Sequence, residues 1–352
     1  MRGPACRDHV YRVSASSAGS LPTVPVIRSI GRFAARRRRA LLVFAALLAA
    51  LPIALYAVGE SYRGRNFRAD FARLRGTLVA AEESALEPQD GHSLAELTLR
   101  DDLGLTVRGF VKAPLEPQGP RPTLVLLGGL RTGRKTLDYV HDTRGVVLLA
   151  LDYPYEGKNS GLGLWEFASA LPAMHGAVLR TIPAAMLAVD YLLARPDVDP
   201  DRIVLVGGSI GALFAPAIAA TDERLAGVAL LFGAGDLGGL ARANLAEEHN
   251  WLAGPASWVG SVLTAAVEPL EYAGDISPRP VFMLSGTGDD RMPERFSRRL
   301  HDAVGQPKKV VWIEAGHVDI RSTEFHRLVT SELVTWLRDA CLIDSSAYIE
   351  SG

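Results

Sequence analysis

Three residue types that cooperate in nucleophilic catalysis follow three separate apolar segments of this chain. Ser209 is the central residue of a G-x-S-x-G motif, Asp289 comes 80 positions later, and His317 follows after a further 28. A serine hydroxyl becomes a strong nucleophile when a histidine takes its proton and a carboxylate orients that histidine. The three residues therefore predict an acyl-transfer reaction through a covalent intermediate on Ser209.

The surroundings of Ser209 strengthen this prediction. An apolar segment at 202–206 leads into the motif, a helical pattern over 210–220 follows, and Gly207 and Gly211 stand two residues before and after the serine. A nucleophile elbow needs such a sharp strand-to-helix turn with very small residues at these two positions. A glycine-rich turn whose serine caps a helix is the structural alternative. Because motif and context agree, we predict the elbow.

Three carboxylates compete for the role of the acid. Asp289 and Asp290 both follow the apolar run at 280–284, and Asp236 also ends a predicted strand. His317 follows Gly316 after another apolar run, and histidine is the side chain best suited to proton transfer near neutral pH. We predict Asp289 as the acid, with Asp236 held in reserve.

These motifs resemble those of serine α/β-hydrolases over 94–340. Members of this superfamily carry the nucleophile, the acid and the histidine in this chain order. The segment DVDPDRI at 197–203 resembles dienelactone-hydrolase-like proteins and acyl esterases, and Asp289 lies four residues before Pro293 as in the family's acid loop. The resemblance implies an oxyanion hole formed by the backbone N–H of Ile210 and by one from the loop after the third strand. Gly129 and Leu130 are the candidates there, and we favour Leu130.

The elements needed to position these residues recur along the body of the chain. Val-, Leu- and Ile-rich runs alternate with helical patterns, and the later runs are continuous, as in parallel strands covered on both faces. We predict an α/β-hydrolase fold with a mostly parallel eight-stranded sheet and helices on both faces. The segment 236–275, which contains Trp251 and Trp258, is long enough for two helices of a small cap with an apolar pocket wall.

A basic arm and an apolar segment precede this body. Residues 1–39 hold nine Arg and one acid, and the 20 residues at 40–59 carry no charge, which is enough for a helix to cross a bilayer. Arg36–Arg39 directly before that segment favour an N-terminus left in the cytoplasm and a body outside it. We predict a single-pass signal anchor, with cleavage near Ala57-Val58-Gly59 as the alternative that would release a secreted enzyme.

The predicted organisation is therefore a cytoplasmic arm, an anchor, a juxtamembrane stalk at 60–93, the catalytic domain at 94–340 and a tail at 341–352. Several other classes of protein are disfavoured. The body is mildly acidic, which does not suit a nucleic-acid binder, and no H-E-x-x-H motif is present. We expect neither a metal nor another cofactor.

The favoured function is hydrolysis of small-molecule carboxylic esters with short to medium acyl chains. A peptidase, amidase or thioesterase on the same fold is the alternative, and a catalytically silent binding or scaffold module is the alternative from another class. Large oligopeptidases of this fold carry a gating propeller, and the stretch at 60–93 is too short to form one. The sequence leaves the oligomeric state open.

Overall fold

The computed structural model describes residues 26–89, 91–115, 119–129, 132–158, 161, 163–246, 253–317 and 322–351. The chain divides into two compact units, Met1–Val58 and Gly59–Gly352. In the first unit, the described residues form a single element, the helix α1 (Val26–Arg63), whose last residues belong to the second unit. Every side chain from Arg36 to Val58 is exposed, and α1 is long and apolar enough to cross a membrane, a property that signal sequences share.

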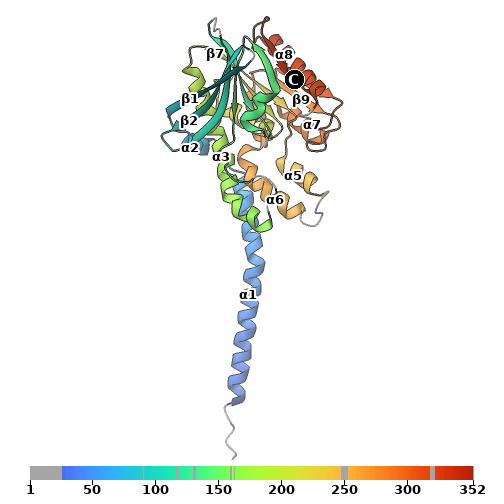
Figure 1. Cartoon of the computed structure of the whole chain (residues 1–352). Helices are drawn as coiled ribbons and strands as arrows, with labels where there is room; N and C mark the ends of the chain where they lie inside the picture. The colour runs from blue at the N-terminus through green and yellow to red at the C-terminus, as the bar shows by residue number, and fades with distance from the viewer. Residues whose placement is uncertain are drawn as a thin grey trace, which may run out of the picture. The chain divides into compact units, whose positions relative to one another are not determined.

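The second unit is built on a sheet of nine strands in the order β1-β2-β3-β6-β4-β7-β8-β9-β10 (Figure 1). The first three strands and β6 pair antiparallel, and β6, β4 and all strands beyond them pair in parallel. The strands are β1 (Leu78–Gln89), β2 (His92–Asp101), β3 (Thr106–Pro114), β4 (Arg121–Leu127), β6 (Val147–Leu151), β7 (Val198–Gly208), β8 (Gly227–Leu231), β9 (Val281–Gly286) and β10 (Lys308–Ile313). The α/β-hydrolase fold predicted from the sequence is confirmed.

The sheet has one strand more than the eight expected. Residues 60–93 do not form a separate stalk: they contribute the end of α1, the short helix α2 (Arg68–Leu74) and β1, all within the second unit. Strand β1 was missed because its middle is polar, with Glu82, Glu83 and Ser84, and it sits at the edge of the sheet, where backbone bonding to β2 holds it. The expected tail likewise contains β11 (Tyr348–Ser351), which pairs antiparallel with β5 (Val140–Arg144).

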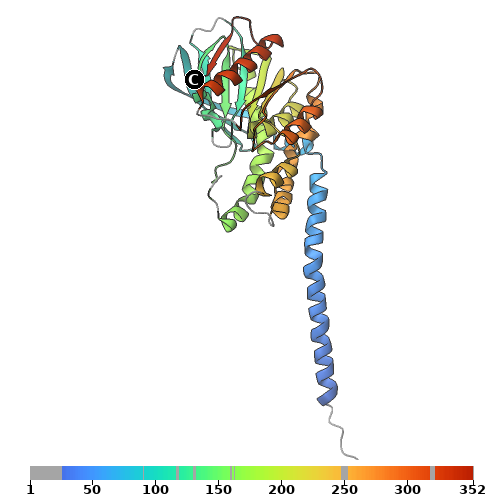
Figure 2. The same cartoon turned by 90° about the vertical axis from the view of Figure 1, so that its right-hand side faces the viewer.

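Helices cover both faces of the sheet (Figure 2). The core on one face includes residues of α3 (Leu164–Leu193), α4 (Ile210–Thr221) and α7 (Glu294–Ala303), and the core on the other face includes α8 (Thr323–Asp339). The second half of α3 is largely buried, whereas its first turns are exposed. Buried apolar side chains on both sides of β4, β7, β8 and β9 explain why these strands are continuous apolar runs.

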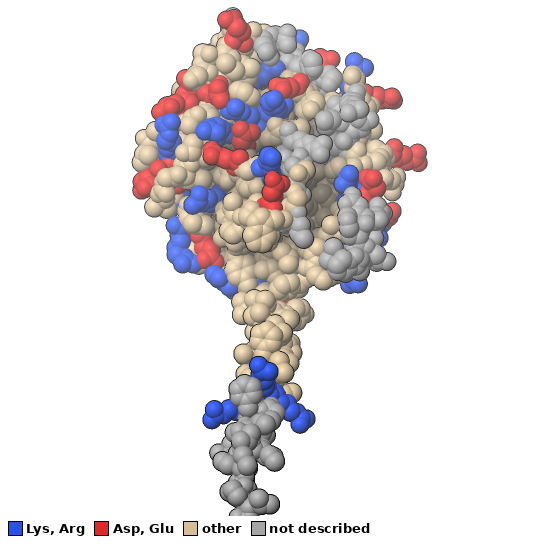
Figure 3. All heavy atoms as spheres, turned by 60° about the horizontal axis from the view of Figure 1, so that its bottom comes forward, with Lys and Arg blue, Asp and Glu red and all other residues tan. Residues whose placement is uncertain are grey.

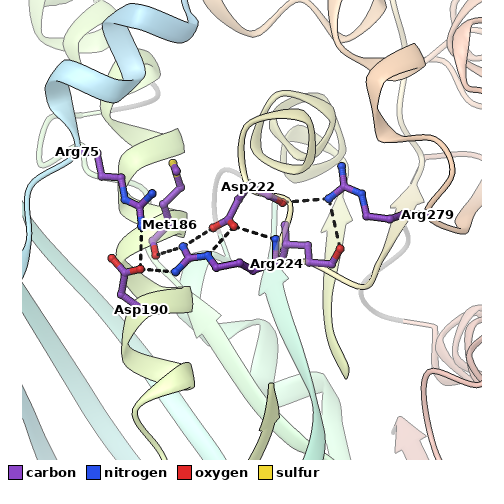
Figure 4. Close-up of polar contacts among 7 residues, drawn as sticks. Arg75, Met186, Asp190, Asp222, Arg224 and Arg279 are labelled. Carbon is purple, nitrogen blue, oxygen red and sulfur yellow. Dashed lines mark hydrogen bonds and ion pairs between the residues drawn. The ribbon is translucent and has the colours of Figure 1, made fainter. Parts of the chain in front are cut away.

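A network of arginines and aspartates ties α3 and the end of α4 to their neighbours (Figure 4). Asp190 on α3 accepts hydrogen bonds from Arg75 at 2.9 Å and from Arg224 at 2.5 Å. Arg224 also donates to the buried carboxylate of Asp222, and Arg279 donates to the Asp222 backbone oxygen at 3.0 Å. The buried Asp222 carboxylate would be costly without partners, so it needs these hydrogen bonds. Because Asp222 caps the C-terminal end of α4, the network stabilises the native position of the helix that follows Ser209.

The segment expected to form a cap contains two helices, α5 (Leu237–Ala246) and α6 (Ala253–Thr264), which pack against each other. Short 3-10 turns η2 (Ala265–Val267), η3 (Pro269–Glu271) and η4 (Ala273–Ile276) lead back to β9. Figure 1 shows α5 and α6 beside the first half of α3, away from the sheet. Since α5 follows the C-terminal end of β8, this layer emerges from the edge of the sheet at which β7 delivers Ser209.

Candidate active site

Ser209 occupies a tight turn between the last residue of β7 and the first residue of α4. Its backbone has φ 53° and ψ −115°, a conformation that residues with a side chain seldom adopt. The Ser209 N–H donates to the Leu231 carbonyl oxygen at 2.9 Å, and the Ser209 carbonyl accepts from the Ala212 N–H at 3.0 Å. These bonds to β8 and to the first turn of α4 hold the strained residue in place.

The two glycines of the motif are required by close backbone contacts. A Cβ atom on residue 207 would lie 2.5 Å from the carbonyl oxygen of Gly211, and one on residue 211 would lie 2.0 Å from the carbonyl oxygen of Leu127. Both distances are far below van der Waals contact. The turn can therefore bring α4 this close to β4 and β7 only with hydrogen as the side chain at both positions.

A continuous chain of hydrogen bonds joins Ser209, His317 and Asp289. The Ser209 Oγ lies 2.8 Å from Nε2 of His317, and the opposite ring nitrogen, Nδ1, lies 2.8 Å and 3.0 Å from the two carboxylate oxygens of Asp289. Asp289 is buried, and its Oδ1 also accepts the backbone N–H groups of Arg291 and Met292 at 2.9 Å and 2.8 Å. This arrangement can take a proton from the serine and stabilise the resulting imidazolium.

The two other candidate acids lie in different surroundings. Asp290 is exposed. Asp236 forms an ion pair with Arg299 and accepts the Gly239 N–H at 2.9 Å in the first turn of α5. The carboxylate that bonds to the His317 ring is thus that of Asp289.

A phenylalanine that the sequence analysis did not single out packs against the histidine. The ring of Phe232 meets the His317 ring edge-on, with centroids 6.0 Å apart and an interplanar angle of 78°. Phe232 directly follows β8, has φ 56°, and donates its N–H to the Leu284 carbonyl at 2.7 Å. Such a backbone is rare for a bulky residue. Its place at the end of a parallel strand, as for Ser209 and Asp289, is the signal that could have identified it.

The loop after β4 lies beside the elbow and is held by a second residue missed from the sequence. The Tyr153 hydroxyl donates to the Gly128 carbonyl oxygen at 2.5 Å, and its ring packs against Phe214 of α4 with centroids 5.6 Å apart. Burial raises the pKa of Tyr153, which keeps the hydroxyl protonated as a donor. The Thr132 Oγ1 donates to the Gly129 carbonyl at 3.1 Å.

Of the two residues expected to supply oxyanion donors, the structure describes Ile210 and not Leu130. Ile210 is the first residue of α4, so its N–H belongs to the helix end at which backbone donors are unsatisfied and the dipole is positive. Gly129 lies on the adjacent loop, and Leu130 lies outside the described residues. A Cβ on Gly128 would lie 1.9 Å from the Thr136 Oγ1 and 2.5 Å from the Thr132 Oγ1, so a larger residue at this position would displace both threonine side chains.

His175 and Trp258, two further side chains that could bind a ligand or line a pocket, have structural partners. His175 Nδ1 lies 2.9 Å from the Leu263 carbonyl and its Nε2 lies 2.7 Å from the Tyr62 hydroxyl. Trp258, which is expected at a pocket wall, donates its indole N–H to Glu60 at 2.9 Å, and the pocket wall itself stays a prediction. Trp251 lies outside the described residues. Within the described ranges, no three His, Cys, Asp or Glu side chains are grouped as metal ligands.

Several known proteins are similar to this chain in sequence. The profile of the prolyl oligopeptidase family matches residues 165–341. The chain is 26% identical over 207 residues to the uncharacterized protein YfhR of Salmonella typhi, covering 56% of this chain and 63% of that protein. It is 31% identical over 146 residues to the esterase FrsA of Pectobacterium atrosepticum, covering 40% and 32% respectively. The chain thus spans less than two thirds of these relatives.

Solved structures share the fold. Acetyl xylan esterase 1 from Thermoanaerobacterium sp. JW/SL YS485 aligns with a TM-score of 0.60 at 17% identity, over 80% of this chain and 93% of that one. The acetyl xylan esterase from Paenibacillus sp. R4 aligns with a TM-score of 0.61 at 20% identity, over 76% and 92%. The family profile covers half of the chain and includes the elbow, Asp289 and His317. The chain therefore belongs to the prolyl oligopeptidase family and has the α/β-hydrolase fold.

Proposed function

We propose that this enzyme is a membrane-anchored carboxylic ester hydrolase whose catalytic residues are Ser209, His317 and Asp289. The observation that carries the proposal is the hydrogen-bonded series from the Ser209 Oγ through the His317 ring to the buried Asp289 carboxylate. Each of these atoms is within the distance needed for proton transfer or for orientation of the imidazole.

The reaction has two halves. The Ser209 Oγ attacks the ester carbonyl carbon while its proton moves to Nε2 of His317. The carbon–oxygen bond to the alcohol then breaks, and His317 gives the proton to the leaving alkoxide. Water, deprotonated by His317, attacks the acyl-enzyme and releases the carboxylic acid and free Ser209. Asp289 fixes the imidazole tautomer and stabilises its positive form in both halves.

The tetrahedral intermediates carry a negative oxygen that needs hydrogen-bond donors. We assign the backbone N–H of Ile210, at the positive end of α4, as one donor. The second donor is the Leu130 N–H, on the loop whose Gly128 carbonyl is held by Tyr153. Removal of one oxyanion donor typically lowers kcat by about 10²–10³. A change that displaces this loop should therefore lower kcat.

The similarity of this chain to a relative named as an esterase, FrsA, which is 31% identical, supports ester substrates over peptides. A peptidase or amidase remains the second candidate, because the matching family profile is that of the prolyl oligopeptidases. We expect short to medium acyl chains to be preferred. A cap of about 40 residues, most of which form its own helices and turns, cannot enclose a long acyl tunnel.

The anchoring part of the proposal rests on α1. The uncharged stretch 40–59 lies within a helix whose side chains are exposed from Arg36 to Val58, and Arg36–Arg39 precede it. We infer a cytoplasmic N-terminus and an extracytoplasmic catalytic unit. A reporter fused after Glu60 should be active outside the cytoplasm, and neutral residues at Arg36–Arg39 should reduce that fraction. Reporter activity confined to the cytoplasm would contradict the orientation.

The catalytic proposal is tested with the full chain purified in detergent. Wild type should react with a fluorophosphonate probe, Ser209→Ala should not, and the matched variant Ser331→Ala, on the exposed side of α8, should react like wild type.

Comparing kcat/KM across aryl esters from acetyl to palmitoyl and across prolyl and alanyl anilides then separates the candidate substrate classes. Labelling that persists in Ser209→Ala would reject the mechanism, and anilides turned over faster than every ester would select the peptidase. A rate that climbs steadily to palmitoyl would reject the short-chain preference.

A further inference from the structure

One layer of the second unit has almost no charged side chains. It comprises α5, α6 and the first half of α3 (residues 165–179), and we call it the cap layer. Helix α6 contains no Asp, Glu, Lys or Arg, the cap-layer part of α3 contains only Glu166, and α5 contains only Arg242. In Figure 3, uncharged residues occupy the lower middle of the face shown, and acidic and basic residues lie around it.

Two large aromatic side chains at the start of α3 are exposed. The exposed fraction is 85% for Trp165 and 43% for Phe167, and Trp165 is the most exposed large hydrophobic residue among the described residues of the second unit. Residues 165–169 are all exposed, so the helix begins clear of its neighbours. Exposed Trp and Phe are unfavourable in water and are typical of surfaces that meet a membrane interface or a partner.

The cap layer is also the part of the unit to which the end of α1 is bound. Gly59 is buried against the Trp258 ring, where a Cβ would approach to 2.3 Å, and Glu60 accepts the Trp258 indole N–H at 2.9 Å. Tyr62 contacts His175 of α3 through a 2.7 Å hydrogen bond and an edge-on ring contact. These contacts fix residues 59–62 to α6 and α3.

The contacts leave no linker between the uncharged stretch and the cap layer. Residue 59 is the last of the 20 uncharged residues and already touches α6. If 40–59 crosses a bilayer, the continuity of the chain brings Gly59, which is bound to α6, to the surface of that bilayer. Trp165 is ten residues from His175, which corresponds to about 15 Å along α3, and the headgroup region is only about 6 Å deep on each side. The reach of α3 is therefore sufficient for its aromatic end to enter the interface.

We propose that the cap layer is a membrane-docking surface whose Trp165 and Phe167 side chains insert among the lipid headgroups of the bilayer that holds residues 40–59. This inference rests on the proposed anchoring by 40–59. The occupant is a lipid surface because Glu166 and Arg242 are the only Asp, Glu, Lys or Arg residues of the cap layer, its exposed aromatics are of the interfacial kind, and the chain enters the unit at this layer.

The test uses the full chain in phosphatidylethanolamine–phosphatidylglycerol vesicles. Cys6 and Cys341, the two cysteines of the chain, are replaced by Ser, and a single new cysteine carries an environment-sensitive nitrobenzoxadiazole dye. The dye is placed at residue 165 (Trp165→Cys), at residue 48 within the uncharged stretch (Leu48→Cys), or at residue 103 as a matched exposed control (Leu103→Cys), since Leu103 is 60% exposed in the β2–β3 turn. Spin-labelled lipids then quench the dye wherever it lies in the bilayer. Fluorophosphonate labelling of Ser209 verifies that each variant is folded.

We expect the dye at 48 and the dye at 165 to be quenched several-fold more than the dye at 103. Quenching at 48 with the dye at 165 as unquenched as that at 103 would overturn the docking surface and leave the anchor intact. A dye at 165 that is shielded from water but not quenched by lipid would indicate a protein partner, such as a second copy, and would also overturn the proposal. A dye at 48 that is not quenched would reject the anchor itself, and the fluorophosphonate result would still report separately on the ester hydrolase.

Discussion

The phenolic hydroxyl of Tyr153, at the end of β6, donates a 2.5 Å hydrogen bond to the carbonyl oxygen of Gly128, two residues before the proposed oxyanion donor of Leu130. Tyr153 is packed on Phe214 of the helix that begins at Ile210. One side chain thus contacts both structural elements from which the oxyanion donors are expected to come. This arrangement suggests that Tyr153 positions the oxyanion hole without touching substrate.

Replacement of Tyr153 by Phe tests that role. The substitution removes one hydrogen bond, worth about 1–1.5 kcal/mol, and retains the ring, so kcat should fall about tenfold with little change in KM. The matched control is Tyr155→Phe, because the Tyr155 hydroxyl bonds only locally to the Lys158 carbonyl, at 3.1 Å on the surface. Equal kcat values for Tyr153→Phe and Tyr155→Phe would show that the loop does not depend on this bond.

The acid assignment predicts a sharp difference between adjacent residues. Asp289→Asn should lower kcat by about 10⁴, since an amide would favour the wrong tautomer of His317. Asp290→Asn, which changes an exposed side chain, should lower it by less than about threefold. Steady-state kinetics of the two variants and of Asp236→Asn decide the matter. The assignment fails if Asp290→Asn or Asp236→Asn proves the most damaging.

Glycine substitutions should separate steric need from helix propensity. Gly211→Ala would place a Cβ 2.0 Å from a fixed backbone oxygen, so we expect a loss of at least about 3 kcal/mol of stability or failure to fold. Gly176→Ala, in the middle of α3, would meet nothing within 4 Å and should stabilise the protein by up to about 1 kcal/mol. Thermal unfolding compares them, and a stable, active Gly211→Ala enzyme would contradict the described elbow.

Stability should also depend on pH through His301. Burial lowers the pKa of His301 from its ordinary 6.5 to about 4, and its Nε2 lies 3.1 Å from the Ser285 hydroxyl. Between these pH values the unfolded chain binds a proton that the folded chain does not. The free energy of unfolding should therefore decrease as pH falls from about 6.5 to about 4, by roughly 3 kcal/mol in total, and the contribution should not change further below pH 4. In His301→Gln the decrease over this range should be smaller. An identical pH dependence in wild type and variant would remove His301 as the cause.

The parallel part of the fold was predictable because its strands are buried on both faces. β7, β8 and β9 are continuous apolar runs, and that composition alone distinguishes them from surface segments. β1 could not be found in this way, since Glu82 and Glu83 interrupt its hydrophobic pattern and its place depends on backbone pairing with β2. Edge strands owe their position to a neighbour more than to their own residues.

The residues of the candidate site likewise divide into those with a local sequence signal and those placed by contacts with distant parts of the chain. Ser209 was identifiable because Gly207 and Gly211 mark a turn that admits no side chain, a purely local requirement. Phe232 had only its place at the end of a parallel strand as a signal, and Tyr153 was not identifiable, because its contact with Gly128 joins residues distant in sequence and leaves no local motif. Trp258 was expected at a pocket wall on the basis of its residue type, but the packing of residues 59 and 60 determines its position. The catalytic roles of Ser209, Asp289 and His317 stay predictions until the variants above are measured.

The attachment of residues 59–62 to α6 and α3 also determines where the enzyme can be cut. Proteolysis between Val58 and Gly59 would release a soluble catalytic unit that retains Glu60 against Trp258 and Tyr62 against His175. A cut only five residues later, after Arg63, would strip that covering from both helices and leave their apolar sides in water. If 40–59 anchors the enzyme, release of an intact catalytic unit is thus confined to a few residues at the end of the apolar stretch, which include the small-residue sequence Ala57-Val58-Gly59.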